Sequence, residues 1–214
     1  MDIIFISDLH GKYAAIEKLP KADALLVGGD FVTLDGEGAL RNAIAIIAEK
    51  FPTFLAVSGN MDPVTTDSVL LETGHALSSE KCATVCGQRV YGLGGANRSP
   101  FNTPNEWDEA AAEARLANIP ENGADIIVTH APPFESGADK ISSGAFVGSK
   151  AIAACVSRAN PAFLLCGHIH EAAGIYKFGK TILINPGQFG DRGSFATIRM
   201  NDGEAPFAWL SHCN

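Results

Sequence analysis

Short apolar segments recur along the chain at a length typical of β-strands. Most of them run into Gly, Asn, Asp or Ser, which favour turns, so each segment is predicted to be a buried strand that ends where the polar residues begin. These segments span residues 3–6, 24–27, 53–57, 89–92, 126–128, 163–166, 181–184, 195–198 and 207–210.

Segments with helical patterning cover residues 12–19, 38–50, 105–118 and 149–160. In the third of these, Trp107 and the alanine-rich stretch 110–117 predict an amphipathic helix packed on the core. Strand and helix alternate over the first two thirds of the chain, whereas the last third is mostly strand and turn. The pattern therefore predicts an α/β fold whose sheets gain antiparallel strands toward the C-terminus.

The chain has 214 residues, of which 46% are apolar, and this is enough for one α/β domain spanning residues 1–214. No apolar stretch approaches the roughly 20 residues of a membrane span. The residues after Met1 also lack the basic and long apolar regions of a secretory signal. We therefore expect a cytoplasmic protein that does not bind membranes.

The five cysteines, an odd number, fit a reducing compartment rather than a disulfide framework. Cys82 and Cys86 have a C-x3-C spacing, but no second cysteine pair completes a zinc site, so we interpret them as packing residues. The formal net charge of −8 argues against nucleic acid as a partner, because broad electrostatic binding normally needs a basic surface. A small phosphate substrate is not excluded, because bound metal ions can reverse the local field.

Chemically similar side chains follow five successive predicted strands. Each of these strands runs into a short polar segment that contains Asp, His or Asn. Because ligands bind beyond the carboxyl ends of the strands in open α/β sheets, these side chains are predicted to converge on one edge. In chain order they are Asp8, His10, Asp30, Asn60, His130, His168 and His170.

Two carboxylates, four imidazoles and one amide are more donors than one metal ion needs, and no thiolate is among them. The set predicts a two-metal site, in which cations about 3.5–4 Å apart hold a phosphoryl group and activate a hydroxide for in-line attack. In the alternative interpretation each residue is an ordinary polar loop residue. That alternative has to apply separately at five strand ends, so we favour the metal site.

The same residues form the ordered blocks D-x-H, G-D, G-N-x-D, a single H and G-H-x-H between Asp8 and His170. This order resembles the calcineurin-like metallophosphoesterases, in particular their small bacterial and archaeal phosphodiesterase branch. The resemblance implies a four-layer α/β/β/α sandwich of two mixed β-sheets flanked by helices. It also implies hydrolysis of a small phosphodiester or other phosphate ester by a hydroxide activated at two divalent ions.

The resemblance further implies the role of each residue. Asp8, His10 and His170 are expected to bind one ion, Asn60, His130 and His168 the other, and Asp30 both. Asp8, Asp30, Asn60 and His130 are expected to take part in catalysis. Manganese is the first expectation for the metal, with zinc, nickel, cobalt or iron as alternatives.

Two loops resemble further features of that branch. The segment 92–96, followed by Ser99-Pro100-Phe101, resembles its glycine-rich loop. Arg98 in this loop, together with Asn60, is a candidate to bind the substrate phosphate, and the alternative for Arg98 is simple solvation. The segment Asn185-Pro186-Gly187 resembles a late turn of the family, for which we favour a purely structural role.

Met61 stands where many members of the family have a histidine. A thioether cannot donate a proton, so a general acid for the leaving oxygen is missing, and leaving groups of low pKa are expected to react best. The neighbouring Asp62 is a candidate to orient His10 or His130, or to cap the segment after Pro63. His75 and His212 lie outside the set, and both are expected to be exposed.

Two other functions are weighed. A non-catalytic scaffold, as in the retromer subunit of the same family, is expected to have lost metal ligands, and here none is missing. A nuclease is disfavoured by the acidic charge and by the absence of a DNA-binding appendage. Substrate specificity is expected to reside in the loops 96–106 and 132–148, whose shapes the sequence does not provide.

Overall fold

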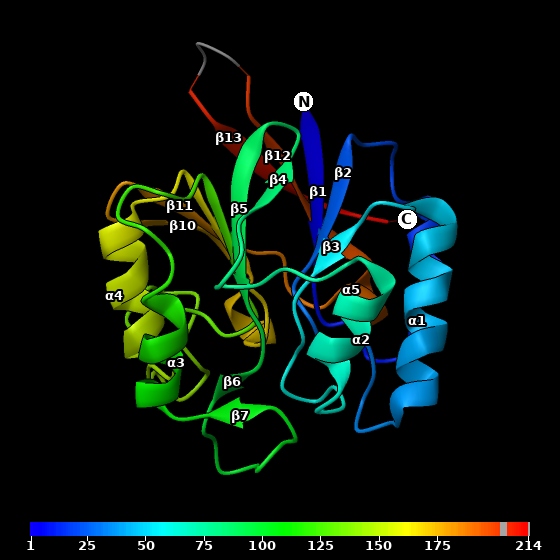
Figure 1. The fold of residues 1–214 in the computed structure, drawn as a ribbon, viewed down its shortest axis with the longest axis horizontal. Coiled ribbons are helices and arrows are strands. Elements are labelled where there is room, and N and C mark those ends of the chain that lie inside the picture. The colour runs from blue at the N-terminus through cyan, green and yellow to red at the C-terminus, as the bar shows by residue number, and fades with distance from the viewer. Residues whose placement is uncertain (202–204, 214) are drawn as a thin grey trace.

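The computed structural model describes residues 1–201 and 205–213. Two large β-sheets pack face to face in the middle of the molecule, and helices cover the outer face of each sheet (Figure 1). The helices α1 and α2 lie beside one sheet, and α3 and α4 lie beside the other. The predicted four-layer α/β/β/α sandwich of two mixed sheets is therefore confirmed.

The first sheet has five strands in the order β13-β12-β1-β2-β3. Its strands β1 (Asp2–Ile6), β2 (Ala24–Val27) and β3 (Leu55–Ala56) are parallel to one another. The strand β12 (Ser194–Arg199) pairs antiparallel with β1, and β13 (Phe207–His212) pairs antiparallel with β12. The late strands thus add to this sheet in the antiparallel sense that the sequence pattern predicts.

The second sheet has six strands in the order β10-β11-β9-β8-β5-β4. The four strands β11, β9, β8 and β5 are parallel, and a hairpin strand flanks each end of this group. The bounds are β4 (Ala83–Val85), β5 (Gln88–Leu93), β8 (Ile126–Thr129), β9 (Phe163–Leu165), β10 (Gly174–Phe178) and β11 (Thr181–Asn185). A separate parallel pair joins β6 (Ala96–Asn97) to β7 (Glu106–Trp107).

The helices and 3-10 turns connect these strands. They are α1 (Glu37–Lys50), α2 (Thr66–Thr73), α3 (Glu109–Leu116), α4 (Lys150–Ala159), the short α5 (Phe189–Arg192), η1 (Ala14–Lys18) and η2 (His170–Ala172). Among the described residues, none of these helices has the length and apolar character needed to cross a membrane.

Side-chain alternation along the strands builds the layers. In β1, Ile3 and Phe5 belong to the cluster between the two sheets, whereas Ile4 and Ile6 belong to the cluster beneath α1 and α2. Because both faces of a central strand are covered, the sequence is a continuous apolar run rather than an alternation of apolar and polar residues. A third cluster lies between the second sheet and the helices α3 and α4.

Two of the four predicted helices differ from the structure. The segment 12–19 contains only the 3-10 turn η1, and the third helix begins at Glu109 rather than at residue 105. Trp107 therefore lies in β7, where its indole N–H donates to the Gly94 carbonyl at 2.9 Å. The Asp108 side chain accepts a hydrogen bond from Ala111 N and caps the helix, which explains the late start.

His75 is buried, and the expectation that it is exposed is wrong. Its ring stacks on Phe54 with the ring centroids 4.0 Å apart, and its Nδ1 lies 2.9 Å from the Phe54 carbonyl oxygen. The unpredicted helix α2 precedes His75, and its C-cap residue Gly74 has a left-handed conformation that turns the chain back onto the sheet. His212 is exposed, as predicted.

Candidate metal centre

The carboxyl ends of β1, β2, β3, β8 and β9 meet at one edge of the two sheets. Each strand continues into one of the five polar segments, and backbone hydrogen bonds join these segments to one another. His10 N donates to Asp30 O at 2.9 Å, and Gly167 N donates to His130 O at 3.0 Å. The convergence predicted from the strand ends is therefore present in the fold.

One group of possible ligands consists of Asp8, His10 and His170. His170 Nε2 lies 3.1 Å from Asp8 Oδ1 and 3.4 Å from His10 Nε2. Asp8 is fully buried, whereas the His170 side chain retains 40% of its exposure. The three ligand atoms thus face one point that solvent reaches from the His170 side.

A second group consists of Asp8, Asp30 and His130, all of them buried. His130 Nε2 lies 3.5 Å from Asp30 Oδ2 and 2.8 Å from Asn60 Oδ1. The His168 ring centroid is 5.0 Å from that of His130. His10 Nε2 is 3.8 Å from Asp30 Oδ2, so Asp30 lies between the two groups.

The backbone at these positions is strained. Asp8, His10, Asp30 and His168 have φ angles of 60°, 49°, 52° and 68°, in the left-handed region that residues other than glycine rarely occupy. Such a conformation costs about 1–3 kcal/mol per residue and persists only where the surrounding structure holds it. Strain concentrated on four of seven candidate ligands is typical of a functional site.

Two glycines allow the loops to approach closely. A Cβ atom on Gly59 would lie 2.0 Å from Asp30 Oδ1, and one on Gly167 would lie 2.3 Å from Asp8 Oδ2. Any side chain at either position would displace a carboxylate of the cluster. The glycines in the G-N and G-H-x-H blocks are thus required by the geometry of Asp30 and Asp8.

Hydrogen bonds behind the cluster orient the ring and amide groups. His130 Nδ1 lies 2.7 Å from the Gly28 carbonyl oxygen and His10 Nδ1 lies 3.2 Å from Thr33 Oγ1, so each ring turns its Nε2 toward the centre. The Asn60 amide nitrogen donates to Thr103 Oγ1 at 2.9 Å, which turns Oδ1 toward the centre. Such contacts commonly orient metal ligands.

Burial and the charges of neighbouring residues shift the pKa values of side chains in the cluster. Burial alone lowers the pKa of His130, but the Asp30 carboxylate outweighs burial and raises it to about 9. Burial alone raises the pKa of Asp8, but the hydrogen bond with His170 and the charge of His130 lower it below its ordinary value. Burial and the neighbouring His130 lower the pKa of His168 to about 4. The buried carboxylates therefore attract positive charge, which protons or metal ions can supply.

The donor set suits divalent cations. In residues 1–201 and 205–213, the only cationic partners within 4.0 Å of Asp8 or Asp30 are histidines, with no lysine or arginine. Buried carboxylates require compensating charge, and mixed imidazole and carboxylate donors suit manganese, iron, cobalt, nickel or zinc. Asp and His groups that could bind metal are therefore present.

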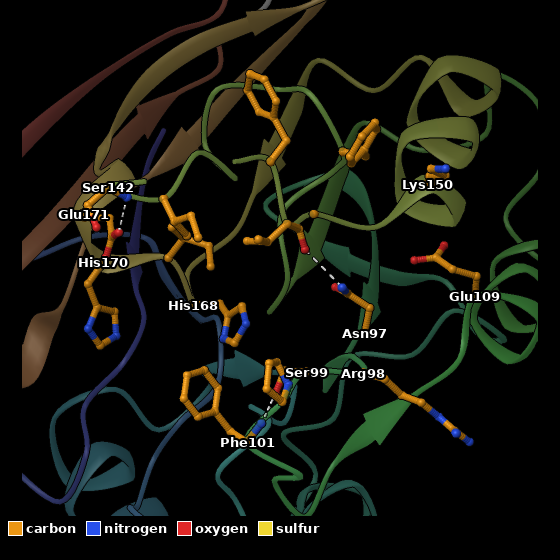
Figure 2. Close-up of a pocket in the computed structure, with 17 residues that line it drawn as sticks. Asn97, Arg98, Ser99, Phe101, Glu109, Ser142, Lys150, His168, His170 and Glu171 are labelled. Atoms are coloured by element: carbon orange, nitrogen blue, oxygen red, sulfur yellow. Dashed lines mark hydrogen bonds between the residues drawn. The ribbon is translucent and has the colours of Figure 1, made fainter. Parts of the chain in front are cut away.

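Arg98 lies at the rim, outside the cluster. Its side chain is 76% exposed and points away from His168 (Figure 2). One guanidinium nitrogen of Arg98 lies 3.7 Å from Asp108 Oδ2. Its contact with a substrate stays a prediction.

Asp62 has neither of the two expected roles. It accepts hydrogen bonds from Gly59 N at 2.8 Å and Val32 N at 3.1 Å, and so joins two loops of the centre rather than binding a histidine. Thr65 occupies the N-cap position of α2, so the interpretation of Asp62 as the cap of this helix is wrong. Burial and the Asp30 charge raise the pKa of Asp62 to about 7.

Asn185 is buried, and its side chain donates to Ile169 O at 2.8 Å and accepts from Gly187 N at 2.9 Å. Ile169 is the residue between His168 and His170, so the late turn supports the G-H-x-H loop. The favoured structural role of this turn agrees with these contacts.

Thr103 and Glu106 support the candidate metal centre, although the sequence pattern does not single them out. Glu106 accepts hydrogen bonds from Thr103 Oγ1 at 2.8 Å and Ser99 Oγ at 2.6 Å, and Thr103 in turn holds Asn60. Thr103 lies 43 positions from Asn60, and no local pattern links the two residues. Only the T-x-x-E spacing suggests the Thr103–Glu106 contact, and this spacing is common in loops and at helix starts.

A family model and a sequence relative each match most of this chain. Residues 1–203 match the model of the calcineurin-like phosphoesterase superfamily domain. An uncharacterized protein of Methanocaldococcus jannaschii, MJ1162, is 38% identical over 197 residues, covering 87% of this chain and 88% of that protein.

Solved structures with low sequence identity share the fold. TT1561 of Thermus thermophilus has a TM-score of 0.72 at 18% identity, covering 100% of this chain and 99% of that one. The phosphopantetheinyl hydrolase of Mycobacterium tuberculosis has a TM-score of 0.61 at 18% identity, covering 87% and 89%.

Proposed function

The chain belongs to the calcineurin-like phosphoesterase superfamily, and from this premise we propose that it is a phosphodiesterase that uses two divalent metal ions. The observation that carries the proposal is the pair of buried carboxylates, Asp8 and Asp30, surrounded by imidazoles and without a lysine or arginine partner among the described residues. Such a centre needs cations, and a phosphate ester needs a cationic site.

The residues would divide between the two ions as the ordered motif implies. Asp8, His10 and His170, whose ligand atoms face one another, would hold one ion. The candidate ligands of the second ion are Asn60, His130 and His168. Asp30 lies within 3.8 Å of His10 and 3.5 Å of His130, which supports its role as a ligand shared by both ions.

When bound, the two ions would supply positive charge to the phosphoryl oxygens and would lower the pKa of a nucleophilic water molecule. Residues of the chain support this chemistry through their charge and their orientation. Asp8 and Asp30 contribute a formal charge of −2, which two divalent ions turn into a net positive charge that attracts the substrate. Asn60 presents its oxygen to the centre, because Thr103 accepts its amide N–H.

The absence of a proton donor next to Asn60 supports a phosphodiester with a good leaving group. Met61 follows Asn60, and its backbone N–H donates to Asp30 Oδ1 at 2.9 Å. Its thioether cannot protonate a departing oxygen, so an alkoxide would leave slowly, whereas a phenolate or another weakly basic oxygen leaves without help. Manganese is proposed first for the metal, although the donor set also suits zinc, nickel, cobalt and iron.

The test is metal analysis of the purified protein together with hydrolysis of bis-p-nitrophenyl phosphate and p-nitrophenyl phosphate, each with and without Mn²⁺. We expect close to two metal ions per chain, metal-dependent diester cleavage that exceeds monoester cleavage, and loss of activity on chelation. Asp30→Asn should lose metal and activity, whereas Asp23→Asn, beside the opposite end of β1, should retain both. A protein without metal and without turnover would overturn the proposal and favour a scaffold.

A further inference from the structure

A pocket of about 830 Å³ opens beside His168 and His170 (Figure 2). The remaining lining comes mainly from the two loops at residues 96–106 and 132–148 and from the start of α4. This volume is in the range of pockets that bind small molecules. Because two candidate ligands belong to its wall, a substrate bound at the metal centre would extend one of its organic groups into this pocket.

Aromatic and aliphatic side chains dominate the wall. Phe134 and Phe146 form an edge-to-face pair with centroids 6.4 Å apart, and Phe101 comes from the other loop. Phe101 is 83% exposed and Phe146 is 40% exposed, although large apolar side chains are normally covered. Exposed rings gathered in one concave site next to a reactive centre are typical of ligand-binding surfaces.

Buried or hydrogen-bonded carboxylates hold both loops in place. The fully buried Asp139 accepts hydrogen bonds from four backbone N–H groups of its loop, at distances of 2.8 to 3.2 Å. Glu106 binds Ser99 and Thr103 in the other loop. The Asn97 side chain donates to Val147 O at 3.1 Å and joins the two loops. These hydrogen bonds fix the shape of the pocket and hold its phenylalanine rings away from the hydrophobic core.

The lining of the pocket carries no net formal charge. Arg98 and Lys150 balance Glu109 and Glu171, so the formal charges of the lining cancel in a chain whose net charge is −8. Glu109 binds Ser149 and the α4 backbone, and Glu171 accepts from Ser142 N. Lys150 Nζ lies 5.3 Å from the Phe134 ring centroid, on the pocket wall. A phosphate ester would thus meet an apolar surface without net repulsion.

We propose that this pocket binds an aromatic ring carried by an ester group of the substrate, so that the substrates are phosphodiesters with an aromatic substituent. This inference rests on the proposed function, because the phosphoryl group has to bind at the metal centre. The exposed rings provide faces and edges that pair with another aromatic ring in stacked or edge-to-face geometry. A saturated group of similar size would gain only the burial of its surface.

The test measures binding of three phosphonates, which resist hydrolysis, to the Mn²⁺-loaded protein by isothermal titration calorimetry. Methylphosphonate reports on the metal centre alone, cyclohexylphosphonate adds apolar volume, and phenylphosphonate adds an aromatic ring of similar size. We expect phenylphosphonate to bind at least about tenfold more tightly than methylphosphonate, and also more tightly than cyclohexylphosphonate.

Two variants test whether the preference for phenylphosphonate arises in this pocket. Phe146→Ala should remove most of the preference for phenylphosphonate and leave methylphosphonate binding unchanged, because the ring is partly exposed and its loss should not unfold the chain. Phe207→Ala is the matched control, since Phe207 is 44% exposed, on β13, and should change neither affinity. Equal binding of phenyl- and methylphosphonate, or of phenyl- and cyclohexylphosphonate, would overturn the inference while leaving the proposed function intact. Failure of every phosphonate to bind, together with no hydrolysis of bis-p-nitrophenyl phosphate, would instead overturn the proposed function.

Discussion

The amide nitrogen of Asn60 donates to Thr103 Oγ1 at 2.9 Å, and this hydrogen bond fixes which end of the amide faces His130. The Thr103 hydroxyl donates its single proton to Glu106 Oε1 at 2.8 Å, so it can only accept a hydrogen bond from Asn60. The Asn60 oxygen must then turn toward His130 Nε2, which lies 2.8 Å away. A loop outside the centre thus orients one of its candidate ligands.

Thr103→Val should weaken metal binding at the Asn60 side of the centre. Valine has a similar shape but cannot accept the amide N–H, so the Asn60 amide is free to rotate. Loss of such an orienting contact typically lowers metal affinity about 10- to 100-fold. Calorimetric titration with Mn²⁺ measures the change, and Thr103→Ser, which keeps the hydroxyl, should restore the affinity. Two ions bound by the valine variant with unchanged affinity would contradict this role.

Glu106 should stabilise the fold above pH 4.5. Burial alone raises the pKa of Glu106, but hydrogen bonds from Ser99 and Thr103 outweigh it and lower the pKa from 4.5 to about 2. A lowered folded pKa contributes stability that is fully present above 4.5 and is lost as the pH falls through about 2. Because solvent reaches the carboxylate, we expect a contribution of about 1–2 kcal/mol.

Urea unfolding from pH 7 to pH 2 tests this assignment. Glu106→Gln should lower the free energy of unfolding at pH 7, and its difference from the unchanged chain should shrink between pH 4.5 and pH 2. Glu113→Gln, at an exposed position on α3, should follow the unchanged chain throughout. A constant difference across the whole pH range would show that the carboxylate charge is not what stabilises the loop.

The sequence predicted the convergence of the candidate ligands because the relevant information is local. Each polar block follows a short apolar strand directly, and the parallel order of β1, β2 and β3 brings their ends together. The same reasoning found most strands within one or two residues. It could not find α2, because this helix presents only a few buried residues to the core and its apolar positions form no clear stripe. The burial of His75, which follows α2, is not visible in the sequence pattern for the same reason.

The pocket depends on contacts that sequence patterns do not encode. The loops 96–106 and 132–148 owe their shapes to side chains that bind backbone N–H groups, chiefly Asp139 and Glu106. Such hydrogen bonds have no periodicity, unlike the packing of strands and helices. The roles of Asp62 and Asn185 likewise became clear only from their partners, which lie on other loops.

Asn185→Ala should destabilise the chain and loosen the G-H-x-H loop. The substitution leaves Ile169 O and Gly187 N without their partners in a buried site, at a cost of about 2–3 kcal/mol. Urea unfolding measures the loss of stability, and Mn²⁺ titration should show weaker binding, since Ile169 lies between two candidate ligands. Asn118→Ala, at an exposed position, should change stability by less than about 0.5 kcal/mol. A destabilised variant that binds Mn²⁺ with unchanged affinity would mean that the turn does not position the loop.

Met61→His should extend the activity to poorer leaving groups. An imidazole at this position, directly after Asn60, could protonate the departing oxygen, and general acid catalysis is typically worth about 10²–10⁴-fold. We therefore expect the largest gain for diesters with alkyl leaving groups and little gain for p-nitrophenyl esters, whose leaving oxygen needs no proton. The measurement is kcat for a series of diesters of increasing leaving-group pKa, with Met61→Leu as the control of similar size. An equal gain across the series would argue against proton donation, because a general acid must act most strongly where the leaving oxygen is most basic.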